Sequence, residues 1–368
     1  MIVPPGAAGD QSTATHAALG ISVIVPTRNR AGELKDCLSH LATQETGLPA
    51  PPVGGAQAGG LFTPTPKSLV WGFTYEVLVV DNGSTDGTRS LVEQLAPDYP
   101  VPLRYVYEGA QGKSHALNAG IRLARGRILA FTDDDLVTTS RWLRRLWMCF
   151  VEEQADAVTG KILPLWTAER PAWLTDDALR LGETGCLDYG DRRLHRKQRP
   201  GHNLRWVGGN LAIRRDVVER VGGYDVRMIR AQDTEYYWRC IRQGLAVVYE
   251  PAALAYHTLG EDRMTPEHFR RWRHRTGYYH AYLVPWRKHH LLTIMPLPWY
   301  RKTLTMSVRW MRALATRRPW GERFREELRL REAWSVWLHR LQLWPRWALT
   351  VITGRSWMPD HHATNGSR

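Results

Sequence analysis

Along the first part of the chain, continuous apolar runs alternate with segments in which apolar residues recur at helical spacing. Four runs dominated by apolar residues, each of strand length, suit strands that are buried on both faces of a sheet. The runs are ISVIVP (21–26), YEVLVV (75–80), LRYVY (103–107) and ILAF (128–131). Between them, apolar residues recur at helical spacing, as in Leu34, Leu38 and Leu41. This β-α-β-α-β-α-β order predicts an α/β fold with a mostly parallel sheet and helices on both faces.

Two segments interrupt this alternation. Residues 1–19 contain neither the basic start nor the apolar stretch of a secretory signal, and we expect a flexible N-terminal tail. Residues 46–74 are dense in proline and glycine, which predicts a flexible insertion. Near the C-terminus, LLTIMPLPWY contains two prolines and is about half as long as a membrane-spanning helix, so we expect no such helix.

Three adjacent aspartates follow the fourth apolar run. In open α/β sheets, ligands bind at the carboxyl ends of the strands, where these residues should lie. Side chains alternate along an extended chain, so Asp133 and Asp135 should point to one side and Asp134 to the other. Two convergent carboxylates repel each other unless a cation lies between them, which favours a metal site. The alternative is a solvated loop before a helix that Thr139 or Ser140 caps.

Other polar residues follow the remaining runs and should share this edge of the sheet. Asn29, Asp81 and Lys113 come after the first, second and third runs, so we expect the active site there. Two nucleotide-binding alternatives fit less well. The first turn lacks the GxGxxG motif, and the GKS sequence at 112–114 lacks the earlier glycine of a P-loop because Tyr107 stands in its place. An ordinary solvated lysine is the alternative for Lys113.

Cysteines and charges narrow the class of protein. The four cysteines are scattered without a CxxC pair, which argues against a zinc site or a disulfide framework and indicates a reducing compartment. The net charge is +14, and the stretch from Glu261 to the end holds 21 Lys/Arg against 8 Asp/Glu and ten of the 17 tryptophans. Basic residues interleaved with aromatic ones are typical of segments that contact an anionic membrane or a nucleic acid.

Several motifs occur in an order that resembles one enzyme family. SVIVPTRNR, VVDNGSTDGT, GKSHALNAG and FTDDD follow one another as in family 2 glycosyltransferases, which are inverting enzymes with the GT-A fold. GGNLAIRRDVVERVGGYD followed by AQDTEYYWR resembles the acceptor half of that family. The resemblance covers residues 20–260, interrupted by the Pro/Gly-rich insertion.

The resemblance implies a nucleotide-diphospho-sugar donor, most simply a UDP-sugar, and a divalent metal. Asp81 would accept a hydrogen bond from a uracil-like base or a ribose hydroxyl, and Asp81 as a turn-forming residue before Asn-Gly is the alternative. The residues expected to bind the donor are Pro26, Thr27, Asn29, Asp81, Lys113, Asp133, Asp134, Gly209 and Asn210. The metal, Mn²⁺ or Mg²⁺, would be held by Asp135, with Asp133 and His257 as further ligands. Trp206 is a candidate sugar-stacking platform.

The resemblance also implies a general base. Asp233 matches the family's catalytic aspartate and would take the proton of the acceptor hydroxyl, so that one displacement inverts the anomeric configuration. Gln232 replaces the customary glutamate of the family, which bears on acceptor binding. Asp233 as a helix cap is the structural alternative, and Glu235 is the second candidate base.

We divide the chain into a tail (1–19), a nucleotide-sugar-binding half (20–160), an acceptor-binding half (161–260) and a helical, basic C-terminal region (261–368). The basic, tryptophan-rich composition of the last region predicts that the protein is cytoplasmic and lies on the inner face of the cytoplasmic membrane. The predicted acceptor is a lipid-linked or cell-envelope glycan. The alternative is that Trp272, Trp310 and Trp334 pack onto the catalytic domain.

A non-catalytic adaptor is the alternative function. Such a protein would bind nucleic acid or membrane through its basic region and keep a degenerate fold of the same class. A degenerate site should have lost at least one of Asp81, Asp133, Asp135 and Asp233, and all four are present. We therefore favour the enzyme and expect no nucleic-acid partner.

Overall fold

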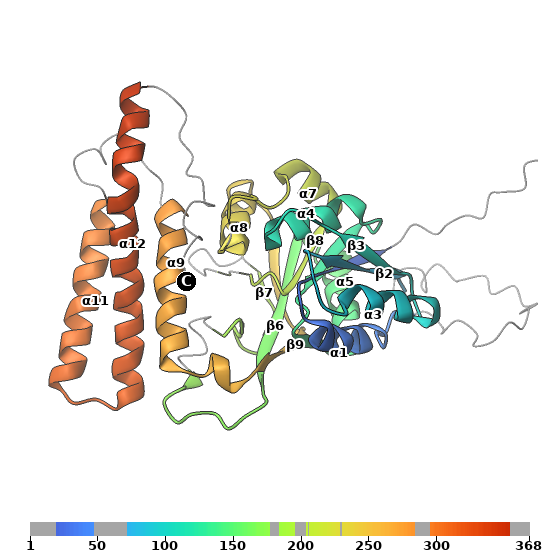
Figure 1. Ribbon diagram of the computed structural model, residues 1–368, viewed down its shortest axis with the longest axis horizontal. Coiled ribbons are helices and arrows are strands. Elements are labelled where there is room, and N and C mark those ends of the chain that lie inside the picture. Colours follow the sequence, from blue (N-terminus) through green and yellow to red (C-terminus); the bar gives the residue numbers. More distant parts are fainter. Residues whose placement is uncertain are drawn as a thin grey trace, which may run out of the picture.

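The computed structural model describes residues 20–47, 72–176, 184–195, 204, 206–228, 230–283 and 295–353. The predicted tail (1–19) lies outside these ranges, as do residues 48–71 of the predicted insertion. The described elements are nine strands, the helices between them and three long C-terminal helices, which Figure 1 shows beside the sheet.

The four predicted strands form the parallel half of one sheet. They are β1 (Ile21–Thr27), β2 (Tyr75–Asp81), β3 (Leu103–Tyr107) and β4 (Ile128–Thr132), in the spatial order β3-β2-β1-β4. All residues of β1, β2 and β4 are buried, as their continuous apolar runs require. The polar residues that follow these strands therefore lie at one edge of the sheet.

The other half of the sheet is mostly antiparallel. Its strands are β5 (Leu136–Thr138), β6 (Ala157–Trp166), β7 (Leu194–His195), β8 (Asn210–Arg214) and β9 (Val247–Leu259). β8 joins the halves because it pairs antiparallel with both β4 and β6, while β6 and β9 are parallel. The predicted boundary between residues 160 and 161 falls inside β6, so one continuous sheet runs through both proposed halves.

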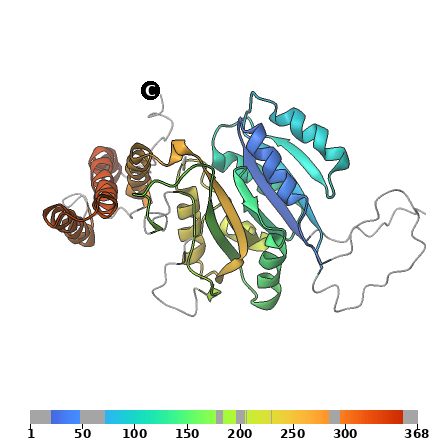
Figure 2. The ribbon, with the colours of Figure 1, turned by 90° about the horizontal axis from the view of Figure 1, so that it is seen from below.

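Helices cover both faces of this sheet (Figure 2). The connecting helices are α1 (Ala31–Leu41), α3 (Thr88–Leu95), α4 (Lys113–Leu123), α5 (Trp142–Glu152), α7 (Arg215–Val221) and α8 (Gln232–Arg242), with short 3₁₀ turns at Ala96–Asp98 (η1) and Glu261–Arg263 (η2). One apolar core lies under α1 and α5, and a second lies under α4, α7 and α8. Each fully buried leucine contributes about 1.5–3 kcal/mol to such a core. The predicted fold class is confirmed.

The start of α5 differs from the prediction. Neither Thr139 nor Ser140 caps this helix, which begins at Trp142. The Thr139 hydroxyl donates to the Leu254 carbonyl instead, because this segment lies against β9. A distant residue satisfies one of the free N–H groups of the first turn, since the Leu143 amide donates to Gln44 Oε1 at 3.0 Å.

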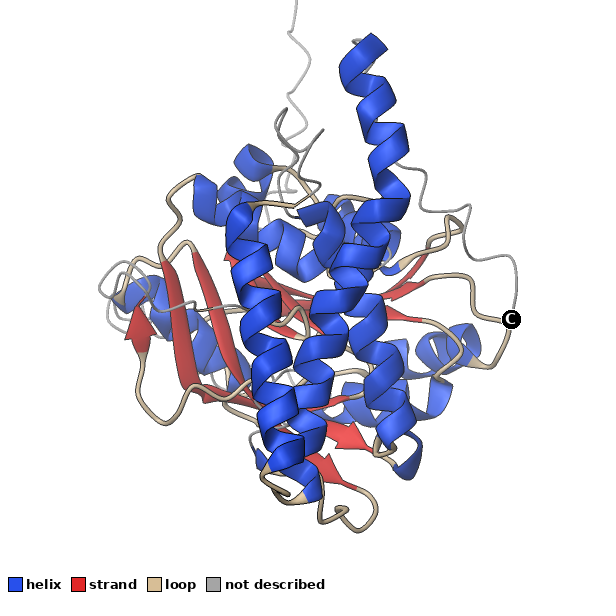
Figure 3. Cartoon of the chain, turned by 90° about the vertical axis from the view of Figure 1, so that its left-hand side faces the viewer, coloured by secondary structure: helices blue, strands red, loops and turns tan. Residues whose placement is uncertain are grey.

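Three helices form a layer at one end of the molecule (Figures 1 and 3). They are α9 (Pro266–Leu283), α11 (Leu297–Ala315) and α12 (Trp320–Thr353), and α12 packs against both of the others. Trp334 is 58% exposed, so it does not pack on the sheet domain as the alternative required. Within the described ranges, none of the helices is long and apolar enough to cross a membrane.

Candidate active site

The three aspartates form a turn at the end of β4. Asp134 and Asp135 lie in this turn, and the Leu136 amide donates to the Asp133 carbonyl at 3.2 Å. The expected alternation of their side chains is therefore wrong, because it requires an extended chain. Asp134 and Asp135 both accept hydrogen bonds from Arg30 Nη1, each at 2.9 Å, and Asp133 is directed elsewhere.

Asp135 is surrounded by cationic side chains. Its Oδ2 accepts from Arg30 and Arg263, each at 2.9 Å, and lies 3.3 Å from His257 Nε2. His257 is near because its strand position in β9 pairs with Leu136, the next residue after Asp135. Burial alone would raise the pKa of Asp135, but His257, Arg263 and Arg30 outweigh it and hold that pKa far below its ordinary value. Asp135 is thus a stable carboxylate.

Asp134 has a contrasting environment. It is 5% exposed, and its carboxylate accepts from the Thr27 hydroxyl at 2.8 Å as well as from Arg30. Burial raises the pKa of Asp134 to about 6, although Arg30 works in the opposite direction. These contacts tie the end of β4 to the end of β1, where Thr27 lies.

Asp133 lies beside Lys113 and Gly209. Lys113 Nζ contacts Asp133 Oδ1 at 2.5 Å from the first residue of α4. Burial alone would lower the pKa of Lys113, but Asp133 and Asp233 outweigh burial and raise that pKa above its ordinary value, so the lysine stays charged. A Cβ atom on Gly209 would lie 3.0 Å from Asp133 Oδ2. This approach follows from the strand register, because Asn210 pairs with Thr132 across β8 and β4.

Asp233 lies against the first glycine of the same Gly-Gly turn. A Cβ atom on Gly208 would collide with the Asp233 carboxylate, so any larger residue there must displace that carboxylate. Asp233 Oδ1 is buried and has no hydrogen-bond partner among the described residues. Burial raises the pKa of Asp233, and Lys113 opposes this shift while Asp133 adds to it. The turn 208–209 therefore contacts two carboxylates that are 100 positions apart in the chain.

The structure disfavours the helix-cap alternative for Asp233. Asp233 is the second residue of α8, and the helix has no side-chain cap. The second candidate base, Glu235, is engaged in a two-point contact with Arg239 at 3.0 and 2.8 Å. Asp233 is consequently the carboxylate of this helix that faces the aspartate turn.

Asp81 and Asn29 lie at the other end of the rim, the edge of the sheet at which β1, β2 and β4 end. Asp81 is 1% exposed and accepts from the Ser84 amide and the Tyr105 hydroxyl, each at 2.7 Å. Asn29 Oδ1 accepts from the Thr85 amide at 2.7 Å. Asp81 thus does form the turn that the alternative described, and its carboxylate oxygens keep further lone pairs for a ligand. Pro26 pairs with Val80 inside the sheet.

Two predicted residues have side chains that point into the fold. Asn210 is fully buried, and its amide donates to the carbonyls of Lys161 (3.0 Å) and Ala253 (2.8 Å) and accepts from Trp142 Nε1 (2.8 Å). Trp206 is 4% exposed, and its Nε1 donates to the Asp233 carbonyl at 3.0 Å. Its ring is too buried to serve as a sugar platform, but it fixes the position of Asp233.

Sequence reasoning missed Arg30 and Arg263. Arg30 follows β1 in a polar turn, and Arg263 comes six residues after His257 in η2. Arg263 also contacts His257 Nε2 at 2.8 Å. The only available signal was the position of each arginine just after a strand that ends at the rim.

The fit of a divalent metal can be judged from the donor groups. Within the described ranges, no group of three or more His, Cys, Asp or Glu side chains is arranged to hold a metal. Asp135 and His257 do adjoin, and the convergence of Arg30 and Arg263 on Asp135 Oδ2 shows that this atom attracts positive charge. A carboxylate oxygen and an imidazole suit an ion that takes its remaining ligands from a diphosphate and water, as Mn²⁺ or Mg²⁺ does.

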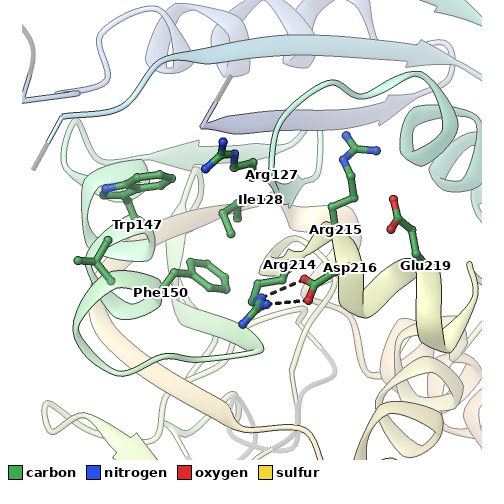
Figure 4. A pocket seen from close by; sticks show the side chains of 9 residues that line it. Arg127, Ile128, Trp147, Phe150, Arg214, Arg215, Asp216 and Glu219 are labelled. Carbon is green, nitrogen blue, oxygen red and sulfur yellow. Dashed lines mark hydrogen bonds and ion pairs between the residues drawn. The ribbon is translucent and has the colours of Figure 1, made fainter. Parts of the chain in front are cut away.

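A pocket of about 460 Å³ lies at the opposite edge of the sheet (Figure 4). Trp147 and Phe150 line one side, and Arg214 pairs there with Asp216 at 2.6 Å. The pocket lies at the start of β4 and the end of β8, whereas the aspartates follow the end of β4. It is therefore separate from the candidate active site.

A parallel half-sheet with carboxylates at its strand ends, continued by a mostly antiparallel half, has the topology of the GT-A class of glycosyltransferases. The Glycosyl transferase family 2 profile matches residues 22–222, and the chain belongs to that family.

Individual relatives are more distant. The chain is 28% identical over 239 residues to Glycosyltransferase AglE of Haloferax volcanii, covering 64% of this chain and 66% of AglE. It is 28% identical over 204 residues to the Glucosyl-dolichyl phosphate glucuronosyltransferase of the same organism, covering 52% of this chain and 62% of that one. The match thus spans less than two thirds of either relative.

Two solved structures resemble the chain at lower sequence identity. The mannosyltransferase PcManGT of Pyrobaculum calidifontis, solved with GDP-Man and Mn²⁺, is 20% identical with a TM-score of 0.49, covering 92% of this chain and 76% of that chain. TarS of S. aureus in complex with UDP-GlcNAc is 18% identical with a TM-score of 0.43, covering 70% and 66%.

Proposed function

We propose that the protein is an inverting glycosyltransferase that moves a sugar from a nucleotide-diphospho-sugar, a UDP-sugar, to an acceptor hydroxyl. The observation that carries this proposal is that Asp133 and Asp233 lie against the adjacent glycines Gly209 and Gly208 of one turn. A base candidate and a donor-side carboxylate adjoin there although they come from different halves of the sheet.

The donor would lie along the rim of β1, β2 and β4. Asp81 would accept from the base or the ribose, with Asn29, Thr27 and Pro26 around it. Lys113, Arg30 and Arg263 would face the diphosphate, since each already neutralises a carboxylate of the aspartate turn. Asp133 and Asp134 would hold these cations in place, and the backbone of Gly209 and Asn210 would border the sugar.

The metal would be bound by Asp135, with His257 and Asp133 beside it. When bound, Mn²⁺ or Mg²⁺ stabilises the negative charge that grows on the leaving diphosphate. Asp135 is suited to this role because its depressed pKa keeps it ionised. A metal there requires Arg263 to give up its contact with Asp135 Oδ2 and turn to the diphosphate.

Asp233 would be the general base. Its raised pKa and its unpartnered Oδ1 suit a group that accepts the proton of the acceptor hydroxyl as the oxygen attacks the anomeric carbon. Attack from the face opposite the diphosphate inverts the anomeric configuration in one step.

The acceptor would be a lipid-linked or cell-envelope glycan at the inner face of the cytoplasmic membrane. Two observations support this part of the proposal. The last 108 residues carry nearly all of the surplus positive charge together with most of the tryptophans. The name of one relative, a Glucosyl-dolichyl phosphate glucuronosyltransferase, refers to a lipid-linked sugar.

The test begins with a panel of UDP-, GDP- and dTDP-sugars screened by thermal shift with Mn²⁺. Hydrolysis of the best donor is then measured for the wild type, Asp135→Ala, Asp233→Ala and the exposed control Asp98→Ala. We expect Asp135→Ala and Asp233→Ala to lose about 10²–10⁴-fold in rate, with the control unchanged. Full activity in both site variants would refute the assignment.

A further inference from the structure

Exposed apolar side chains form one row along α11. Leu297, Leu304, Val308 and Met311 are 74%, 66%, 50% and 54% exposed. At 3.6 residues per turn, these four positions fall within an arc of about 60°. A row of this kind on a water-facing helix costs solubility unless something covers it.

The charge around this row has one sign. Residues 295–321 contain no Asp or Glu, and their cations are Arg301, Lys302, Arg309, Arg312, Arg317 and Arg318. Arg301 and Arg312 lie beside the row, within about 80° of Leu304 on the helical wheel. Among the ion pairs of the described residues, Arg318 pairs with Glu322, whereas Arg301, Arg309 and Arg312 have no acidic partner.

The row faces away from the rest of the molecule. Thr303, on another side of α11, accepts a hydrogen bond from Trp337 Nε1 of α12 at 3.0 Å, so that side is the packed one. Ala313, about 170° from the midline of the row, is also buried. Figure 1 shows α11 as the outermost helix, with α12 and α9 between it and the sheet.

We infer that the outer face of α11 docks on an anionic phospholipid bilayer. Leu297, Leu304, Val308 and Met311 lie among the upper acyl chains, while Arg301 and Arg312 contact lipid phosphates. Charge complementarity selects this occupant, because a second copy of the chain would bring six more cations to the same face. The inference deepens the proposed membrane association and does not depend on the transfer reaction.

The docked layer adjoins the acceptor side of the active site. α9 begins three residues after Arg263, which contacts Asp135, and Arg230, just before α8, stacks on Trp272 of α9 at 5.1 Å. Asp233 lies in the first turn of α8. The helical layer that carries α11 therefore lies next to the segment that leads into the helix of Asp233.

The experiment is flotation of the full-length protein with vesicles of equal parts phosphatidylcholine and phosphatidylglycerol, and with phosphatidylcholine alone. The variant Leu304→Glu/Met311→Glu is compared with the control Leu123→Glu/Val151→Glu, which changes two exposed apolar residues of the sheet domain. Both pairs of positions are exposed, so folding should be unaffected. Hydrolysis of a soluble donor is measured in parallel, so that failure of docking and failure of catalysis are distinguished.

We expect the wild type and the control to float with the anionic vesicles and to be released by high salt. The α11 variant should bind at least about tenfold more weakly, with donor hydrolysis unchanged. Equal flotation of the α11 variant and the wild type would overturn the inference. A second outcome would also overturn the inference. In that outcome the wild type binds neither kind of vesicle and forms a dimer in light scattering, and the α11 variant is monomeric.

Discussion

At the scale of single residues, the account depends on how the acidic groups are compensated. Asp133, Asp134 and Asp135 are consecutive, yet each has a cation within hydrogen-bonding distance, from Lys113 or Arg30. Like charges at this spacing would otherwise raise one another's pKa. Arg263 supplies a further cation at Asp135 Oδ2, where the metal is proposed to bind. The guanidinium and the metal therefore compete for one oxygen.

Arg263→Ala tests this competition. Removing the guanidinium should increase the affinity for Mn²⁺ alone about tenfold, because Asp135 then lacks one of its compensating cations. Affinity for the donor should fall about tenfold, since the diphosphate loses a cation. Isothermal titration with Mn²⁺ and with the donor measures both.

The matched control for this variant is Arg331→Ala, which removes an exposed arginine paired with Glu327. It should change neither affinity. If Arg263→Ala weakened Mn²⁺ binding, Arg263 would not compete with the metal and its assignment would be wrong.

At the scale of elements, a few strand ends and one glycine turn assemble the site. The register of β8 on β4 brings Gly209 to Asp133, and that of β5 on β9 brings His257 to Asp135. Because Gly208 has no side chain, the Asp233 carboxylate can occupy the space beside it. The positions of the proposed base and metal ligands are thus set by backbone pairing.

Gly208→Ala tests the turn. Its methyl group would collide with the Asp233 carboxylate and displace it, so kcat for donor hydrolysis should fall about 100-fold while the KM for the donor changes little. Gly32→Ala is the control, because nothing lies within 4 Å of a Cβ atom there. An unchanged kcat in Gly208→Ala would contradict the proposed role of Asp233.

The sequence predicted the parallel half of the sheet well and the rest of the site less well. β1, β2 and β4 are continuous apolar runs, and such runs leave few alternatives for a chain of alternating helices and strands. The resemblance to family 2 supplied Asp233 and His257, which spacing alone would not have found. The pairing of each carboxylate with its cation depends on the backbone conformation of a turn. Hydrophobic periodicity does not encode that conformation.

Long-range contacts explain the errors. The backbone of Asn210 stays a predicted ligand contact, but its side-chain amide is not available to a ligand because it satisfies two backbone carbonyls inside the sheet. The start of α5 was placed at Thr139 or Ser140, but Gln44, about a hundred residues away, supplies the acceptor for its first turn. Both outcomes depend on partners that are distant in sequence, and one sequence contains no record of such pairs.

At the scale of the whole molecule, a partly buried ionic contact joins the helices of the C-terminal layer. Glu332 of α12 accepts from His280 at 2.9 Å and from Arg273, both in α9. Burial alone would raise the pKa of Glu332, but His280 and Arg273 outweigh it and hold that pKa at about 2, below the usual 4.5. This contact helps to hold the layer that carries α11.

The depressed pKa predicts a loss of stability in acid. The contribution of Glu332 is fully present above pH 4.5 and is lost as the pH falls toward about 2. It should amount to roughly 3 kcal/mol. In thermal melts at a series of pH values, Glu332→Gln should therefore show a smaller decline of Tm below pH 4.5 than the wild type. Parallel pH profiles would contradict the assignment.

The most direct test of the central claim is the electron paramagnetic resonance signal of Mn²⁺ titrated into protein with UDP. The account predicts that wild type and Asp233→Asn remove the signal of free Mn²⁺ equally, because the proposed base does not hold the metal, whereas Asp135→Asn leaves most of the ion free. Equal binding of Mn²⁺ in all three proteins would contradict the claim that Asp135 anchors the metal and its nucleotide at this rim.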